Sequence, residues 1–67
     1  MLEKIQGIIN GYGFGITVQD LASELYWQLE SEGFEPCIVN DRYLDVDGVT
    51  YQIRKTRSKG HWTAVEI

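Results

Sequence analysis

The sequence predicts an α+β fold, in which a short N-terminal helix, a glycine-rich loop and a main helix precede an antiparallel meander of about four strands. Three observations support this fold class. Apolar residues recur at helical spacing up to Gly33, the period changes to two after Pro36, and short turn sequences separate the later segments. Because consecutive hairpins with short turns leave few other topologies, we expect the meander to pack on the main helix.

The composition is that of a globular chain. Hydrophobic residues make up 43% of the 67 residues and charged residues 24%, so we expect residues 1–67 to form one small domain. The single cysteine, Cys37, cannot form an internal disulfide, which makes the cytoplasm the expected location. The N-terminal apolar run is too short and too interrupted for a signal peptide or a membrane span, so we expect no membrane partner.

The first predicted element is a short helix over residues 2–9. Its apolar residues recur at near-helical spacing: Leu2, Ile5 and Ile8 or Ile9. Asn10 and Gly11 form a stop signal. Residues 11–15, Gly-Tyr-Gly-Phe-Gly, then favour a loop, because glycines at alternate positions allow sharp bends and destabilise regular elements.

The main helix is predicted from about residue 18 to residue 32. Thr17 can act as the N-cap, with Asp20 at the third helical position of a capping-box variant. One apolar stripe runs along the helix: Val18, Leu21, Ala22, Leu25 and Leu29. Gly33 can provide a left-handed C-cap, which places Phe34 against the last leucine of the stripe.

Two hairpins are predicted after Pro36, which cannot continue a helix. The first joins residues 37–40 to residues 42–46. The second joins residues 43–46 to residues 49–53 through Asp47-Gly48, the dipeptide that best fits a type I′ turn. With the residues beside this turn paired, one face of the second hairpin should meet the helix: Leu44, Val46, Val49, Tyr51 and Ile53.

The last predicted strand, residues 61–67, has two alternative registers. A three-residue loop at 58–60 would turn Val65 and Ile67 towards the core and Trp62 outwards. A two- or four-residue loop would instead bury the even-numbered side chains from Trp62 onwards, and would turn the only carboxylate of the strand inwards. We expect the first register, because it buries aliphatic side chains rather than a carboxylate.

The sequence carries no signature of catalysis or metal binding. One histidine and one cysteine are too few for a structural zinc site. Cys37 and His61 have no orienting third group at a recognisable spacing, and the carboxylates are scattered as on a solvated surface. We therefore expect a protein that is not an enzyme and has no cofactor.

The charge is unevenly distributed along the chain, whose net charge is −4. Residues 1–53 carry nine acidic and two basic residues, a balance of −7, whereas residues 54–67 carry four basic residues and one acidic residue, a balance of +3. Six residues of the basic end are candidates for contacting nucleic acid: Arg54, Lys55, Arg57, Lys59, His61 and Trp62. The alternative is a hairpin tip whose cations keep it soluble and unpaired, and we favour it because the rest of the chain repels nucleic acid.

A second candidate surface lies on the main helix, on the side opposite the leucines. At 100° per residue, four side chains share this face: Asp20, Glu24, Trp27 and Ser31. Trp27 is either covered by Leu2, Ile5 and Phe14 as a small core of its own, or left exposed for a partner. An exposed tryptophan is a typical anchor of protein interfaces. The carboxylates around it favour a partner with a basic surface, including one that normally holds nucleic acid.

These observations lead to three functional hypotheses. The first is a non-enzymatic protein-interaction module, an inhibitor or regulator of a nucleic-acid-processing host protein. In size and charge the chain is similar to many small proteins of phages and mobile elements that act by occupying a host enzyme. The second is a small nucleic-acid-binding accessory protein that uses the basic residues 54–62. The third and weakest is a homodimer that pairs through an edge strand, with Ile67 available at the chain end.

Overall fold

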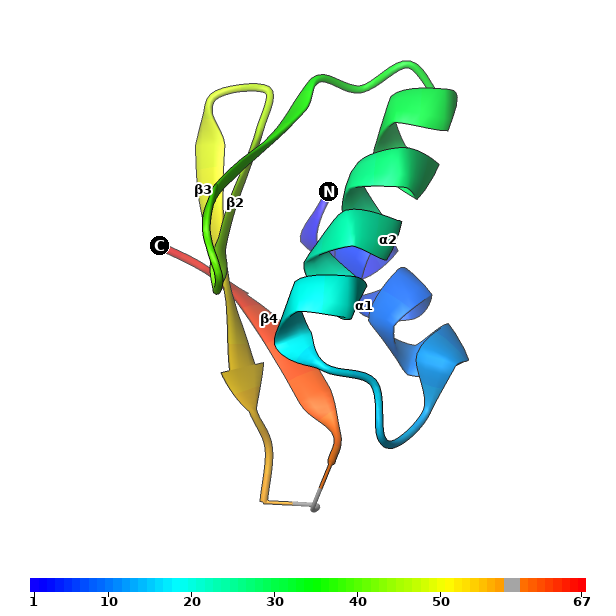
Figure 1. Ribbon diagram of the computed structural model, residues 1–67. Helices are drawn as coiled ribbons and strands as arrows, with labels where there is room; N and C mark the ends of the chain where they lie inside the picture. The colour runs from blue at the N-terminus through cyan, green and yellow to red at the C-terminus, as the bar shows by residue number, and fades with distance from the viewer. Residues whose placement is uncertain (58–59) are drawn as a thin grey trace.

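The computed structural model describes residues 1–57 and 60–67. Within them the elements follow in this order: α1 (Leu2–Tyr12), α2 (Val18–Ser31), β1 (Pro36–Asn40), β2 (Tyr43–Val46), β3 (Val49–Lys55) and β4 (Trp62–Glu66). The strands pair antiparallel in the order β1-β2-β3-β4, and the helices pack on the sheet (Figure 1). The α+β meander expected from the sequence is therefore confirmed.

Helix α1 is longer than the sequence predicts, because it continues through the expected stop signal to Tyr12. The Tyr12 hydroxyl donates a hydrogen bond to a carboxylate oxygen of Glu24 (2.8 Å) and accepts one from Gln28 Nε2 (2.6 Å), both on α2. These contacts stabilise the last turn of α1. The chain leaves the helix at Gly13, whose φ of 65° lies in the region that glycine adopts without strain.

Helix α2 begins and ends as the sequence predicts. The Thr17 side chain accepts a hydrogen bond from the Asp20 amide (3.1 Å), which satisfies one of the free N–H groups of the first turn. At the other end Gly33 has a φ of 92°, and the Phe34 amide donates to the Leu29 carbonyl (3.1 Å). This is the Schellman pattern of hydrogen bonds.

The β2–β3 hairpin has the predicted turn and register. Asp47 and Gly48 have φ angles of 50° and 86°, as a type I′ turn requires, and Val46 pairs with Val49. Of the predicted inward-facing residues, Val49 alone is exposed, and it lies directly after the Asp47-Gly48 turn. The others join the one core that both helices share with the sheet: Ile5, Ile9, Leu21, Ala22, Leu25, Leu29, Leu44, Val46, Tyr51, Ile53, Trp62 and Ala64.

The expected register of the last strand is wrong. Trp62 and Ala64 are buried, whereas Val65 faces the other side of the sheet and Ile67 is 65% exposed. The Thr56 amide donates to the His61 carbonyl (3.1 Å), so positions 57–60 separate the two strands, as in the four-residue alternative. The part of the expected loop at residues 58 and 59 lies outside the described residues.

The expected penalty of this register, an inward carboxylate, does not arise. Glu66 pairs with Tyr51 at the end of β4, where its side chain is exposed. The Trp62 indole is also satisfied, because its Nε1–H donates to the Ile16 carbonyl (2.8 Å). Burial of the Tyr51 phenol, followed by the nearby charges of Glu66 and Asp47, raises its pKa above 10.0.

Candidate functional site

The outer face of α2 presents the four side chains that the helical spacing places together. Asp20, Glu24, Trp27 and Ser31 are all exposed. The leucines of α2 point the opposite way and are fully buried, since α2 lies between the sheet and solvent (Figure 1). The Ser31 hydroxyl donates to the Gln28 carbonyl (2.7 Å), so it is satisfied within its own helix.

Trp27 is not covered by the N-terminal segment. Its side chain is 64% exposed, and its ring meets the Tyr26 ring edge to face at a centroid distance of 6.1 Å. Of the residues considered as a cover, Ile5 lies in the main core, and Phe14 packs against His61 with ring centroids 5.3 Å apart. Of the two arrangements that the sequence left open, the protein has the exposed one.

Carboxylates of α2 raise the pKa of two tyrosines of this region. Tyr12 donates to Glu24, and this bond is the main reason why the pKa of the Tyr12 phenol lies above 10.0. A hydrogen bond with Glu30, followed by the charge of that carboxylate, likewise raises the pKa of the Tyr26 phenol. Both phenols therefore stay protonated at neutral pH.

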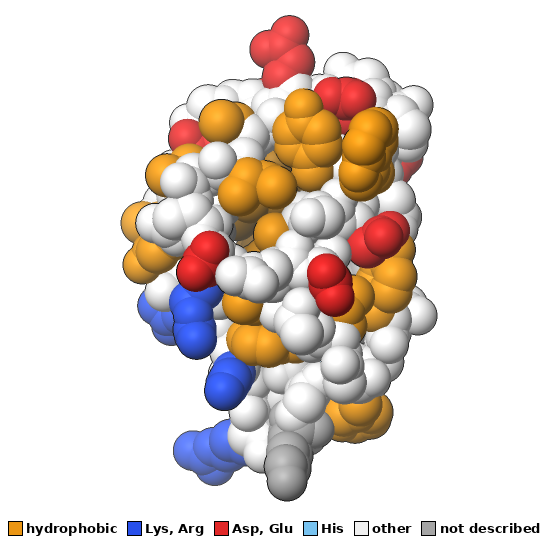
Figure 2. Space-filling view, viewed as in Figure 1, with side chains coloured by type: hydrophobic (Ala, Val, Ile, Leu, Met, Phe, Trp, Pro, Cys, Tyr) orange, Lys and Arg blue, Asp and Glu red, His pale blue; other side chains and the backbone are white. Residues whose placement is uncertain are grey.

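A hollow of about 290 Å³ lies between α2 and the edge strand β1. Its lining consists of four residues: Ser23, Tyr26, Trp27 and Ile38. In the space-filling view, hydrophobic side chains and carboxylates gather over the upper half of the molecule, where α2 and β1 lie (Figure 2). Ser23 and Ile38 were not predicted as site residues. The available signal was the uninterrupted apolar run 37–39, which is unusual in a strand with a solvent-facing side.

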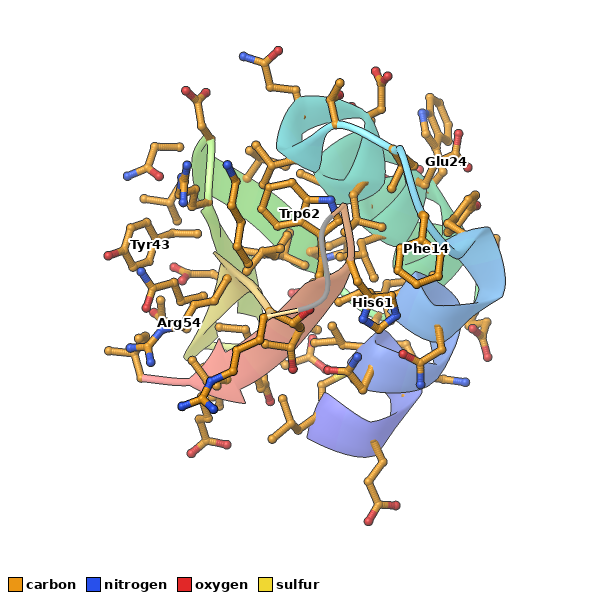
Figure 3. The ribbon with its side chains drawn as sticks, turned by 90° about the horizontal axis from the view of Figure 1, so that it is seen from below. Phe14, Glu24, Tyr43, Arg54, His61 and Trp62 are labelled. Atoms are coloured by element: carbon orange, nitrogen blue, oxygen red, sulfur yellow. The ribbon has the colours of Figure 1, made fainter. Side chains whose placement is uncertain are left out.

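The structure brings together three of the six basic-end candidates, because Lys55, His61 and Trp62 line one hollow of about 370 Å³. Arg54, Lys55 and Arg57 are exposed, and Lys59 lies outside the described residues. Trp62 points into the molecule and is only 7% exposed, so it cannot stack on a base without leaving the core (Figure 3). The His61 ring lies beside Phe14, which leaves it partly covered.

A larger groove of about 660 Å³ runs between the two helices. It is lined by Lys4, Gly7, Ile8, Gly11, Tyr12 and Gln28. Its polar groups are already engaged, because Tyr12 bonds to Glu24 and Gln28, and Lys4 forms an ion pair with Glu32 (2.5 Å). This groove therefore offers less for recognition than the hollow beside Trp27.

Within residues 1–57 and 60–67, no group of three or more His, Cys, Asp or Glu residues is arranged to hold a metal ion. Neither helix of the same ranges has the length and apolar character needed to cross a bilayer.

Comparison with known proteins gives no assignment. No protein-family model, curated protein or solved structure matches this chain.

Proposed function

We propose that this protein is a non-enzymatic interaction module that binds another protein through the outer face of α2. The observation that carries the proposal is Trp27, a large aromatic side chain left 64% exposed among carboxylates. A tryptophan offers a large contact area at a small entropic cost, and interfaces are enriched in it for this reason. Covering the indole on binding would gain the hydrophobic free energy that folding leaves unused.

The charge around Trp27 defines the kind of partner. Residues 5–41 contain no lysine or arginine, and Asp20 and Glu24 are exposed on the same face as the indole. A surface of this kind attracts a basic partner and repels nucleic acid. We therefore infer an inhibitor or regulator of the phage or mobile-element type, acting in the cytoplasm on a protein whose basic surface normally holds nucleic acid.

The nucleic-acid-binding alternative has weaker support. Three exposed cations, Arg54, Lys55 and Arg57, remain available for phosphates. The aromatic part of that candidate site is poorly accessible, because Trp62 belongs to the core and His61 is partly covered by Phe14. The homodimer alternative would bring the acidic faces of two copies together if it used the open edge of β1, which like charges disfavour.

The test is a capture experiment followed by a direct binding measurement. Tagged wild-type protein is used to isolate partners from host lysate, and each identified partner is purified and titrated with wild type and with Trp27→Ala. We expect the substitution to weaken binding by roughly thirtyfold or more, as for the dominant residue of an interface. The partner should also lose bound DNA or RNA when the wild-type protein is added.

Phe14→Ala is the matched control. Phe14 is also an exposed aromatic residue (68%), but it lies in the loop between α1 and α2, beside His61 and outside the hollow lined by Trp27 (Figure 3). Its substitution should leave partner affinity unchanged. Retained binding by Trp27→Ala, with a thermal unfolding curve like that of wild type, would refute the proposed function.

A further inference from the structure

The surface beside Trp27 extends beyond α2 onto the edge strand β1. Ile38 pairs with Leu44 and so shares the sheet face that the helices cover, yet it remains 43% exposed. Trp27 and Ile38 both line the hollow, which lies between them. Cys37 and Val39 are also exposed, but they do not line the hollow.

The size of the hollow limits what it can accept. Its volume of about 290 Å³ lies at or below the range of about 300–1,000 Å³ that is typical of small-molecule pockets. The lining is mainly aromatic and aliphatic, with the Ser23 hydroxyl as a small polar group. These properties fit a single bulky apolar side chain better than a metabolite.

The charge of the rim argues against a second copy of this chain. Trp27 has Glu24 and Glu30 one turn away on either side, and Glu35 and Asp41 flank β1. Residues 5–41 contain no lysine, arginine or histidine to offset them. Two identical faces would bring carboxylates against carboxylates, whereas a lysine- or arginine-bearing segment would pair with them.

The open edge of β1 is poorly suited to pairing with an added strand. Pro36 has no N–H to donate, and the pairing of β1 with β2 shifts between Ile38 and Asn40. Natural proteins use both features to block edge-to-edge association. Side chains rather than backbone hydrogen bonds should therefore provide most of the contacts made here.

We propose that the hollow between α2 and β1 accepts one bulky apolar side chain from a basic segment of the partner protein, with lysines or arginines beside that side chain paired to Glu24 and Glu30. This inference rests on the proposed function and makes it more specific. It extends the contact surface from α2 alone to Ser23, Tyr26 and Ile38.

A displayed library of random twelve-residue peptides provides the probe. Selection on immobilised wild-type protein should enrich peptides with one leucine, methionine, phenylalanine or tryptophan flanked by lysine or arginine. Ser23→Trp, which fills the hollow from an exposed helix position, should weaken binding of the enriched peptides roughly thirtyfold. Asn10→Trp adds the same side chain at an exposed position of α1 outside the hollow, so it is the matched control and should bind like wild type. Circular dichroism verifies that both variants are folded.

The possible results separate the two proposals. In the first, binding of the peptides or of the captured partner requires Trp27 and yet is equally tight to Ser23→Trp and to wild type. In that case the hollow is not the docking site, while the proposed function stands. A selection that enriches no such sequence also overturns this inference. So does sedimentation that shows a dimer weakened by Ser23→Trp, because the occupant would then be a second copy.

Discussion

At the scale of single residues, Gly60 illustrates how two loops distant in sequence are held together. The Gly15 amide donates to the Gly60 carbonyl (3.2 Å), and the Phe14 and His61 rings lie side by side next to this bond (Figure 3). Gly60 has a φ of 78°, and a Cβ built on it would lie 3.3 Å from the Gly15 nitrogen. Both the backbone conformation and the close approach therefore require glycine here.

We predict that Gly60→Ala lowers the free energy of unfolding by about 1–2 kcal/mol, the usual range for an L-residue forced into this conformation. Gly7→Ala is the opposite control. Gly7 lies inside α1 with open space around it, so alanine there should raise stability by about 0.5–1 kcal/mol through its helix propensity. Urea denaturation of both variants measures the difference. If Gly60→Ala and Gly7→Ala were equally stable, the close contact between Gly15 and Gly60 would not form in solution.

At the scale of elements, the two edges of the sheet are protected in different ways. Helix α1 lies along the edge of β4, where Gln6 Oε1 accepts hydrogen bonds from the Ala64 amide and the Thr63 hydroxyl, each at 2.9 Å. The edge of β1 has no such cover among the described residues and depends on Pro36 and its irregular register. At the edge of β4, the Ala64 amide is therefore bonded to Gln6 and cannot pair with an added strand.

We expect Gln6→Leu to lower the free energy of unfolding by about 1–3 kcal/mol, because it leaves the amide of the buried residue Ala64 without an acceptor. Gln6→Glu keeps an acceptor oxygen at the same position and should recover most of that loss. Hydrogen exchange at the Ala64 amide should be faster in Gln6→Leu and near wild type in Gln6→Glu. Unchanged exchange in the leucine variant would contradict the proposed role of α1.

The elements that the sequence predicted well are those defined by short-range signals. Thr17 and Gly33 mark the two ends of α2, and Asp47-Gly48 sets the register of β2 and β3. The register of β4 was missed because its cause is long-range. The Trp62 indole bonds to the Ile16 carbonyl, 46 residues earlier in the chain, and that contact depends on how the helices dock on the sheet.

At the scale of the whole molecule, the docking of α1 decides the exposure of Trp27. Gln6 fixes α1 to β4, so Ile5 and Ile9 enter the main core instead of covering the indole. Helical spacing could place Trp27 opposite the leucines, but it could not tell where α1 would lie. The sequence could not predict Ile38 as a site residue for the same reason, because Ile38 joins the site only when α2 packs beside β1.

The segregation of charge is also a property of the whole molecule. Carboxylates surround α2 and β1, while lysines and arginines gather towards the lower left of the space-filling view (Figure 2). Because the interior of a small protein screens poorly, this arrangement should give the surface around Trp27 a negative potential. Quenching of tryptophan fluorescence by charged ions can measure both this potential and the exposure of the indole.

We predict that the fluorescence lost in Trp27→Phe, relative to wild type, belongs to a red-shifted chromophore that acrylamide quenches readily. The emission that remains comes from buried Trp62 and should resist quenching. Caesium should quench the Trp27 component more strongly than iodide, after normalisation to a free tryptophan derivative, because carboxylates attract the cation and repel the anion. Added inert salt should reduce this preference, since screening acts over about 8 Å at physiological ionic strength. If the Trp27 component resists acrylamide in the free monomer, the indole is covered. If caesium and iodide quench it equally after normalisation, its surroundings are not acidic enough to select a basic partner.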